Sequence, residues 1–439
     1  MPLRRSDQPL FIMTVIELPI LRAIDIPVMD GQAPRLARTL VTQYWRRSQL
    51  LQRPASRPDA FAVFDDSIVQ ALSGLKQHLM HAPELDHACQ QAIETAGAEI
   101  LDEPSRIFAL ACLQALHLQR KHVHDGLERT LGAHLQAQPN AVFNAMRFCF
   151  DNTVAEYFTW LLSQGQHRQS APLAQLLQRL AISRPAVSDE FAQAISAWTS
   201  GLPGGVAALC DWRCTGRGDE AKAIAATQQD SDAQAALLAL ALMGSRQETP
   251  VARTLLARMP HSTVALALLA ARDGHALASA LREGRHPQMS WGRQVYAASL
   301  VGDIPLLRQL AAHTAWEDEE ACRTLADATA LLTGEPADIA FDMGNEASGR
   351  AACVDAALTA LPVSGPALRL GRPRTQVVLQ ESSAMVGAPL RRLLYLEHLS
   401  RVGAALWIEA DDLAVVQALA CSTASVIERA AFNIGRPQP

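Results

Sequence analysis

Six glycines recur at nearly even intervals through the second half of the chain, and this spacing constrains the fold more than any other feature. The intervals are 28, 30, 28, 32 and 31 residues, and the glycines are Gly216, Gly244, Gly274, Gly302, Gly334 and Gly365. Each follows an apolar run that suits a helix, such as AALLALALM before Gly244. Glycine closes a helix in the left-handed conformation without steric cost. The spacing therefore predicts a series of helical hairpins.

The residues after these glycines suit the start of a second helix in each hairpin. Asp303 and Glu335 follow a repeat glycine directly, and a proline comes shortly after each of them. A single hairpin exposes more apolar surface than it can bury, whereas stacked hairpins cover one another. The period is close to that of HEAT repeats, and the signatures of tetratricopeptide and ankyrin repeats are missing. We therefore expect an all-α fold, a HEAT-like α-solenoid of about five stacked hairpins.

The first 200 residues also have helical periodicity, with only one short extended piece, near 11–16. Helices are expected over the ranges 33–52, 84–98, 142–150, 154–163, 172–181 and 189–199, and from Asp65 or Asp66 and from Asp102 onward. The glycine-rich stretch 201–205 breaks this pattern. The resulting domain prediction is an N-terminal extension at 1–32, a helical region at 33–200, a repeat array at 206–371 and a C-terminal helical capping region at 372–439. A second short extended piece is expected near 376–379.

Composition excludes several classes of protein. The net charge is −5, so no chain-wide basic surface is present to bind nucleic acid. Hydrophobic residues make up 49% and charged residues 19%, which excludes a highly charged disordered chain. The apolar segment 10–21 is interrupted by Glu17 and Pro19 and is too short to span a bilayer. We interpret it as a buried N-terminal segment rather than a signal peptide, and expect no membrane insertion.

The cysteines and histidines give no sign of a metal or redox site. The eight cysteines are scattered through apolar helical stretches, which favours a reduced, cytoplasmic protein. Cys210 and Cys214 lie four residues apart, a spacing typical of two core residues on one helical face. The densest histidine cluster is expected to be a solvated polar turn between helices; it contains His117, His122, His124 and His134. The nucleotide-binding, hydrolase and metalloprotease motifs are missing too. We therefore expect no catalytic, cofactor-binding or metal-binding residue.

Two acidic runs lie beside tryptophans. The run 317–320 follows Trp316, and acidic residues are favoured in the first turn of a helix. The run 409–412 follows Trp407, and Asp411 or Asp412 is expected to cap a helix there. Both runs are thus predicted to begin helices rather than to form a catalytic pair of carboxylates, which would need a defined separation across a cleft.

Large or bidentate side chains recur at the predicted junctions between hairpins in a chain whose aromatic content is only 5%. Tryptophan and arginine are enriched among the residues that contribute most to binding at protein interfaces. Neighbouring carboxylates could steer a basic partner towards them. An alternative is that the two tryptophans belong to the core between repeats. The predicted partner-binding residues are Trp291, Trp316, Arg282, Arg285, Glu317 and Asp318.

Three stretches carry a resemblance to a known family. They are YWRRSQLLQRPASRPDAFAVFDDSIVQALSGLKQHL at 44–79, DEPSRIFALACLQAL at 102–116 and LRRLLYLEHLSRVGAALWIEADDLAVVQ at 390–417. In order along the chain, they resemble an uncharacterised bacterial family of HEAT-like repeat proteins. Genes of that family are often found beside spike components of type VI secretion systems. The motifs are packing motifs, and the family provides no catalytic residues to carry over.

The resemblance implies an accessory role in a type VI secretion system. The leading hypothesis is a non-enzymatic scaffold or adaptor that binds another protein, either a secretion effector or a spike component. The alternative is an immunity protein that neutralises a co-encoded toxin. A third hypothesis is an enzyme similar to the HEAT-type bilin lyases that uses a concave groove.

Overall fold

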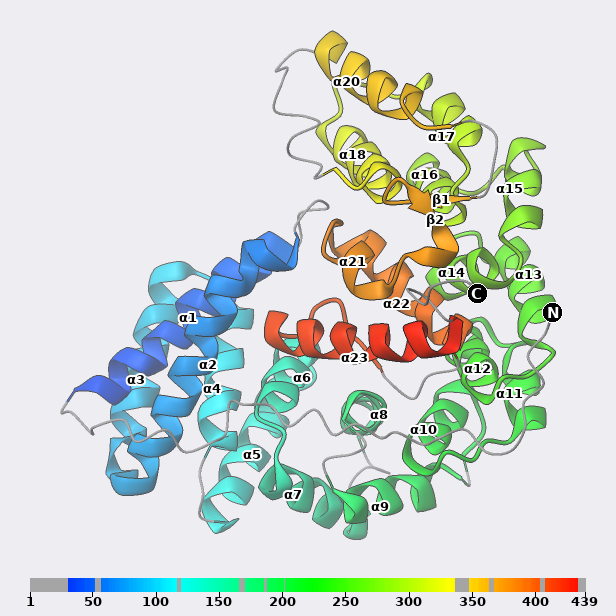
Figure 1. The fold of residues 1–439 in the computed structure, drawn as a ribbon. Helices are drawn as coiled ribbons and strands as arrows, with labels where there is room; N and C mark the ends of the chain where they lie inside the picture. The colour runs from blue at the N-terminus through cyan, green and yellow to red at the C-terminus, as the bar shows by residue number, and fades with distance from the viewer. Residues whose placement is uncertain are drawn as a thin grey trace.

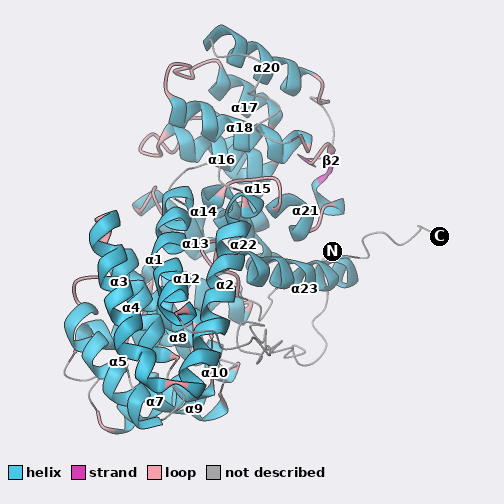
Figure 2. Cartoon of the chain, turned by 90° about the vertical axis from the view of Figure 1, so that its left-hand side faces the viewer, coloured by secondary structure: helices cyan, strands magenta, loops and turns pink. Residues whose placement is uncertain are grey.

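The computed structural model describes most of the chain in detail. The described residues are 31–51, 57–116, 120–165, 170–184, 188–200, 202–335, 347–362, 367–402 and 407–432. Within these ranges the protein is helical apart from one short pair of strands, as Figure 2 shows. The prediction of an all-α fold is confirmed. The expected buried segment at 10–21, the extended piece near 11–16 and Gly365 lie outside the described residues.

Most of the helices form successive pairs. The pairs are α4 (Glu103–Ala115) with α5 (Arg120–His134), α6 (Pro139–Phe148) with α7 (Asn152–Ser163), α8 (Ala171–Ser183) with α9 (Asp189–Thr199), α10 (Gly205–Thr215) with α11 (Glu220–Ala226), α12 (Asp230–Met243) with α13 (Glu248–Arg258), α14 (Thr263–Arg272) with α15 (Gly274–Arg282), α16 (Trp291–Val301) with α17 (Ile304–Ala311), and α18 (Glu319–Thr333) with α20 (Ala347–Thr359). The first helix of each pair packs on the first helix of the next, from α4 to α18. The result is a curved α-solenoid-like stack, an arch in Figure 1 with α11, α13 and α15 along its outer edge.

Four of the repeat glycines close helices in the left-handed conformation, as predicted, whereas Gly274 does not. Gly216, Gly244, Gly302 and Gly334 end α10, α12, α16 and α18 with φ of 68°, 67°, 76° and 83°. Gly274 has no positive φ; it begins α15 directly after α14, at a bend of 114°. Asp303 then caps α17, because its Oδ1 accepts a hydrogen bond from the Leu306 backbone N–H at 3.1 Å. The ends of these helices are therefore determined by residues that are close together in the sequence.

The stack is continuous across the glycine-rich stretch at 201–205. Helices α8 and α9 both pack against α10, which begins at Gly205. A Cβ at Gly205 would meet the backbone of α12 at Asp232 and Ala236, so glycine permits the close approach of α10 and α12. The paired arrangement extends from α4 onward, and the domain division placed here remains a prediction.

Among the described residues, three helices precede the paired array: α1 (Gln32–Leu51), α2 (Pro58–His81) and α3 (Asp86–Ile100), with a short 3-10 turn η2 (Pro83–Leu85). The predicted start of the second helix at Asp65 or Asp66 is wrong. Helix α2 begins at Pro58, where proline suits the first turn. Asp65 lies inside α2 and is buried, because its side chain pairs with Arg47 on α1.

The chain returns through the interior of the arch after α20. This C-terminal segment contains β1 (Leu368–Arg369), β2 (Arg372–Pro373), η5 (Arg374–Gln376), α21 (Leu379–Ser383), α22 (Ala388–Val402) and α23 (Ala414–Phe432). Strands β1 and β2 form a two-residue antiparallel ladder, so the strand pair precedes the extended piece expected at 376–379. Helix α22 packs on α14 and α12, and α23 packs on α2 (Figure 1). The segment thus lies against the inner side of the array.

Helix α23 joins the two main cores of the molecule. One core is built from α1 to α9 and also contains Leu413 and Val416, at the start of α23. The other is built mainly from α10 to α22 and contains Ala420 and Ala424 of the same helix. Helix α23 therefore contributes apolar side chains to both cores.

We expect Gly302→Ala to destabilise the protein more than Gly284→Ala. Both glycines have positive φ, 76° and 66°, so each alanine incurs the left-handed penalty of about 1–2 kcal/mol. A Cβ at Gly302 would also lie 2.7 Å from the Leu368 backbone nitrogen in β1, whereas nothing lies within 4 Å at Gly284. That contact should add about 1–3 kcal/mol. Urea unfolding of both variants checks the difference, and equal losses would contradict it.

Candidate functional site

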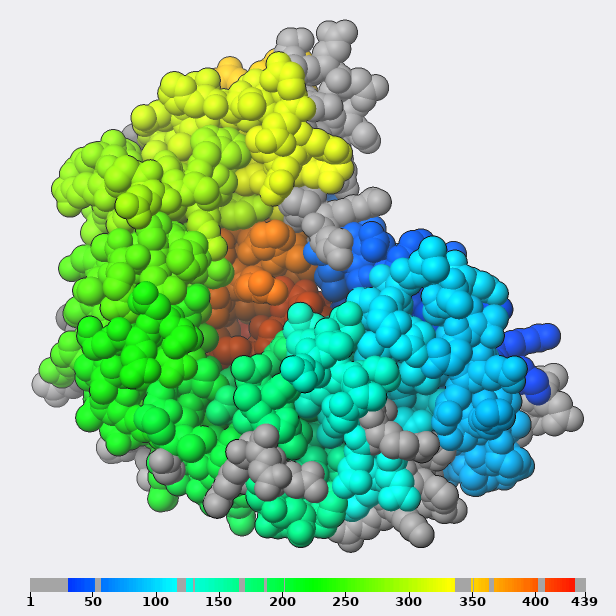
Figure 3. Space-filling model, turned by 180° about the vertical axis from the view of Figure 1, so that it is seen from behind, coloured from blue at the N-terminus to red at the C-terminus, as the bar shows by residue number. Residues whose placement is uncertain are grey.

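The inner side of the arch contains a hollow. In Figure 3 the array surrounds it, and the C-terminal segment forms its floor. One charged part of this segment is the loop 407–413 between α22 and α23, which contains Glu409, Asp411 and Asp412. Arginines on α1, α6 and the end of α8 hold this loop. These helices are far from it in the sequence, so the site exists only in the folded chain.

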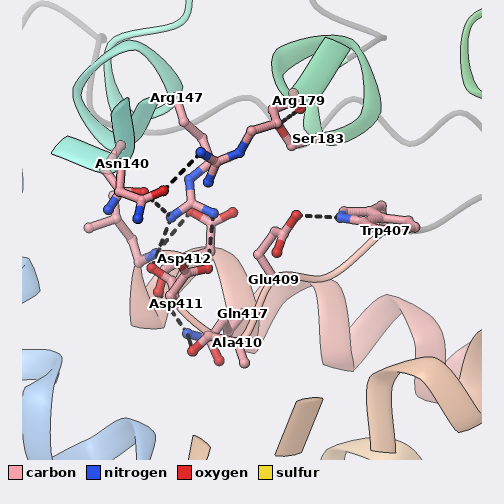
Figure 4. Close-up of polar contacts among 12 residues, drawn as sticks. Asn140, Arg147, Arg179, Ser183, Trp407, Glu409, Ala410, Asp411, Asp412 and Gln417 are labelled. Atoms are coloured by element: carbon pink, nitrogen blue, oxygen red, sulfur yellow. Dashed lines mark hydrogen bonds and ion pairs between the residues drawn. The ribbon is translucent and has the colours of Figure 1, made fainter. Parts of the chain in front are cut away.

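Three arginines bind the two aspartates of the loop. Arg147 on α6 pairs with Asp411, Nη1 to Oδ1, at 3.2 Å, and Arg184 after α8 pairs with Asp412, Nη2 to Oδ2, at 2.7 Å. Arg47 donates through Nη2 to the backbone oxygens of Asp411 and Asp412, at 2.9 and 2.7 Å. Figure 4 shows Asp411 and Asp412 facing the helix that carries Arg147. These charge-assisted bonds fix the loop from three sides.

The cap of α23 comes from a distant helix. Asp65 on α2 accepts a hydrogen bond from the Ala414 backbone N–H at 2.6 Å, while Asp412 accepts from the neighbouring Leu413 N–H at 2.9 Å. The prediction that Asp411 or Asp412 would cap this helix is therefore wrong. The Asp411 side chain instead forms an ion pair with Arg147. Asp65 therefore has one partner on each carboxylate oxygen, Arg47 on Oδ1 and the Ala414 N–H on Oδ2.

Glu409 occupies a different position in the same loop. Its Oε1 accepts a hydrogen bond from Trp407 Nε1 at 2.7 Å (Figure 4). The indole ring lies under the guanidinium of Arg213, whose Cζ is 5.9 Å from the ring centroid. Arg213 Nε in turn donates to the Ile182 backbone oxygen at 2.9 Å. Trp407 and Glu409 are therefore tied to α8 and α10.

The pKa values of Asp411 and Asp412 are lowered in the folded protein, whereas the pKa of Glu409 is raised. Burial acts to raise the pKa of Asp411, but the guanidiniums of Arg147 and Arg47 outweigh it and hold the pKa at about 2. For Asp412, burial is likewise outweighed, by Arg184 and Arg147, so its pKa is also lowered. Burial and the charge of Asp411 raise the pKa of Glu409.

The chemistry of this arrangement is ion pairing. A general acid or base works best with a pKa near the operating pH. Asp411 is ionised at neutral pH and bonded to Arg147, so its contacts suit a structural role. The side chain of Asp411 is nevertheless 35% exposed, which shows that water reaches this part of the floor. The site is thus a fixed, charged and accessible surface inside the arch.

A second buried network holds the other end of the C-terminal segment. The carboxylate of Glu397 on α22 forms ion pairs with three arginines. Its Oε2 lies 2.7 Å from Arg369 Nη2, and its Oε1 lies 2.8 Å from Arg374 Nη2 and 3.7 Å from Arg401 Nη1. Arg369 also donates to the Leu300 backbone oxygen on α16 at 3.1 Å. One carboxylate therefore links the strand pair, α22 and the array.

The two tryptophans predicted to bind a partner lie between hairpins. Trp291 begins α16, and its Nε1 donates to the Leu310 backbone oxygen at the end of α17, at 3.2 Å. The Trp316 backbone oxygen accepts a hydrogen bond from Cys322 Sγ at 3.2 Å. Both rings are half-buried and pack on the core of the array. Their role in binding remains a prediction.

The charged residues of that prediction are exposed at the same junctions. Arg282 pairs with Asp303 and lines a pocket of about 310 Å³ between two neighbouring hairpins, while Arg285 pairs with Glu283. Glu317 is exposed. Asp318 caps α18, since its Oδ1 accepts from the Glu320 backbone N–H at 2.9 Å. The prediction that the run 317–320 begins a helix is confirmed.

Trp291→Ala should cost about 3 kcal/mol, the lower end of the range for truncating a tryptophan, because the ring is only half-buried. The variant loses ring packing and the hydrogen bond to Leu310. Thermal and urea unfolding measure the change. A loss below about 0.5 kcal/mol, the usual limit for surface substitutions, would contradict a packing role.

The histidine cluster is not a turn, so that prediction is wrong. Helix α5 runs from Arg120 to His134 and includes His122 and His124. The His124 ring stacks on Trp160, with centroids 5.2 Å apart. Cys210 is buried on α10, and its Sγ contacts the Gln178 backbone oxygen at 3.5 Å. His117 lies outside the described residues. Among those that are described, no group of three or more His, Cys, Asp or Glu residues is arranged to hold a metal ion.

Comparisons with known proteins add no assignment. A scan against protein-family models, a search of curated proteins and a search of solved structures each gave no match. In the described part of the chain, no single helix has the length and apolar composition needed to cross a membrane. Helices α14 and α15 meet those criteria only when they are counted together across their 114° bend.

Proposed function

We propose that this protein is a non-enzymatic scaffold or adaptor that binds another protein inside its arch. The observation that carries the proposal is the hollow with a fixed, accessible, charged floor (Figure 3). Stacked helical hairpins typically bind partners along a concave surface. Here the loop 407–413 and the inner helices α6, α8 and α10 contribute to that surface. The resemblance to a HEAT-like family supports a partner from a type VI secretion system, either an effector or a spike component.

The preformed surface supports binding rather than turnover. The loop 407–413 is held by arginines on several helices, so its charged groups are positioned before a partner arrives. Preorganised groups lower the entropic cost of association. The carboxylates of Asp411 and Asp412 in this loop pair with arginines, and Asp411 is held ionised. These properties suit recognition of a partner more than proton transfer.

The test is co-purification of the tagged full-length chain with separately expressed spike components, effectors and toxins encoded near its gene. We expect one of these proteins to form a stable complex that survives size-exclusion chromatography. Capture of a toxin together with loss of its toxicity would replace the adaptor role with the immunity role. Absence of a complex with every one of these proteins, from a folded chain, would overturn the proposal.

A further inference from the structure

The loop 407–413 lies in a field with more positive than negative groups. Its carboxylates, and Asp65 beside them, interact with arginines from five different helices and from the end of α8. The carboxylates are Asp65, Glu409, Asp411 and Asp412, and the guanidiniums are those of Arg47, Arg147, Arg179, Arg184, Arg213 and Arg392. These named groups include two more guanidiniums than carboxylates, in a chain whose net charge is −5. Positive charge is therefore concentrated at this part of the hollow.

Arg179 is a half-buried guanidinium of this group that uses few of its hydrogen-bond donors. It stacks on the Phe143 ring, with Cζ 3.8 Å from the centroid, and donates through Nη1 to Asn140 Oδ1 at 2.9 Å. A guanidinium has five N–H donors, and among the described residues only this one hydrogen bond uses them. The bond to Asn140 is exposed to solvent. Arg179 is therefore held in place while a fork of donors remains for a ligand.

Arg147 lies close to Arg179 and increases the local positive charge. Its Cζ is 5.1 Å from the same Phe143 ring, and Figure 4 shows the two guanidinium groups next to each other. Burial lowers the pKa of Arg179 most, the charges of Glu409 and Asp411 raise it, and the charge of Arg147 lowers it by less. Two like charges in a half-buried site repel each other, and an added anion would relieve this repulsion.

The chain's own loop shows which anion these arginines accept. The sequence Glu-Ala-Asp-Asp at 409–412 already presents carboxylates to Arg147 and Arg184 on this wall. Planar guanidinium groups match carboxylates through paired N–H donors. A partner segment rich in Asp or Glu would extend this recognition from Arg147 to the neighbouring Arg179.

We infer that the hollow binds an acidic segment of the partner protein, and that Arg179, stacked on Phe143, is a principal contact for a carboxylate of that segment. This inference rests on the proposed function and specifies the chemistry of its site. The overall negative charge of the chain would repel an acidic segment elsewhere, so the contact depends on this local excess of arginine.

The experiment measures binding of a fluorescent octaglutamate peptide to the full-length protein by anisotropy, at low salt. The test variant is Arg179→Gln. The control is Arg253→Gln on outer helix α13, which removes the same charge from a side chain that is 63% exposed. We expect Arg179→Gln to weaken binding about tenfold or more, because the variant loses charge-assisted hydrogen bonds to the peptide. Arg253→Gln should bind as the wild type does, and added salt should weaken binding in both.

Equal binding by Arg179→Gln and the wild type would overturn the inference, as would failure of the wild type to bind the peptide. Displacement of the peptide by millimolar inorganic phosphate would also overturn it, because the site would then be a general anion site. The two proposals fail separately. A partner captured equally by the wild type and Arg179→Gln would leave the scaffold role intact and remove this contact. Peptide binding that depends on Arg179, without any captured partner, would support the contact with an acidic segment and overturn the scaffold role.

Discussion

Replacing Glu397 with Gln is expected to lower the free energy of unfolding by about 3–5 kcal/mol. Glu397 is buried and is shared by Arg369, Arg374 and Arg401. Glutamine keeps the shape but removes the charge, so buried guanidiniums lose their counter-ion while they remain desolvated. The control is Glu381→Gln on α21, whose side chain is 35% exposed and pairs with Arg372. That variant should lose less than about 1 kcal/mol.

The same substitution should change how stability depends on pH. Burial alone would raise the pKa of Glu397, but Arg369 and Arg374 outweigh it and hold the pKa well below the ordinary value of 4.5. A carboxyl with a depressed pKa stabilises the fold above its unfolded pKa and loses that contribution as the pH falls. The wild type should therefore lose stability below about pH 4.5, and Glu397→Gln should lose less over that range. Parallel slopes would contradict this assignment.

Replacing Arg47 with Met should also cost about 3–5 kcal/mol, because it leaves the buried carboxylate of Asp65 without its counter-ion. The variant also loses the hydrogen bonds from Arg47 to the backbone of Asp411 and Asp412. Arg57→Met is the control. The Arg57 side chain is 23% exposed and lies 3.8 Å from Asp59, an exposed partner, so its loss should be below about 1 kcal/mol.

A double-mutant cycle with Asp65→Asn tests whether the pair explains the cost. The double variant should be less destabilised than the sum of the two single variants, by about 0.5–3 kcal/mol. Burial raises the pKa of Asp65 in spite of Arg47, so its ionisation opposes folding as the pH rises above 3.8. Without Arg47 the pKa of Asp65 should rise further, so this loss of stability should continue to higher pH. Simple additivity, with an unchanged pH profile, would show that the two side chains do not interact.

Features of the fold that depend on neighbouring residues could be predicted from the sequence. Gly244 and Gly302 close their helices because glycine alone adopts the left-handed conformation cheaply, and both the glycine and the apolar run lie within one helix. Asp303 starts α17 by the same kind of local contact. Periodicity also placed α1, which spans Gln32–Leu51, within one residue at each end.

The candidate site could not be predicted in the same way, because its contacts join residues hundreds of positions apart. Asp65 was expected to begin a helix, since aspartate favours that position. In the structure it follows Phe61 by one helical turn and precedes Ile68 on the same buried face. Arg47 likewise follows Leu40 and Tyr44 on the apolar stripe of α1. The available signal was one charged residue on each of two apolar helix faces, Arg47 on α1 and Asp65 on α2. This signal predicts a buried ion pair between the two helices. It does not predict that the pair also binds the loop 407–413.

The cap that Asp65 provides for α23 has a consequence for the order in which the chain folds. The two residues that form this hydrogen bond are 349 positions apart, so α23 receives this acceptor from α2. During synthesis the array therefore leaves the ribosome before the segment 367–432 that covers its inner side. At roughly 5–20 residues per second, this segment takes several seconds to emerge. Over that interval the inner faces of α12 and α14 are uncovered, so nascent chains are most prone to aggregate until α22 has emerged and packed on them.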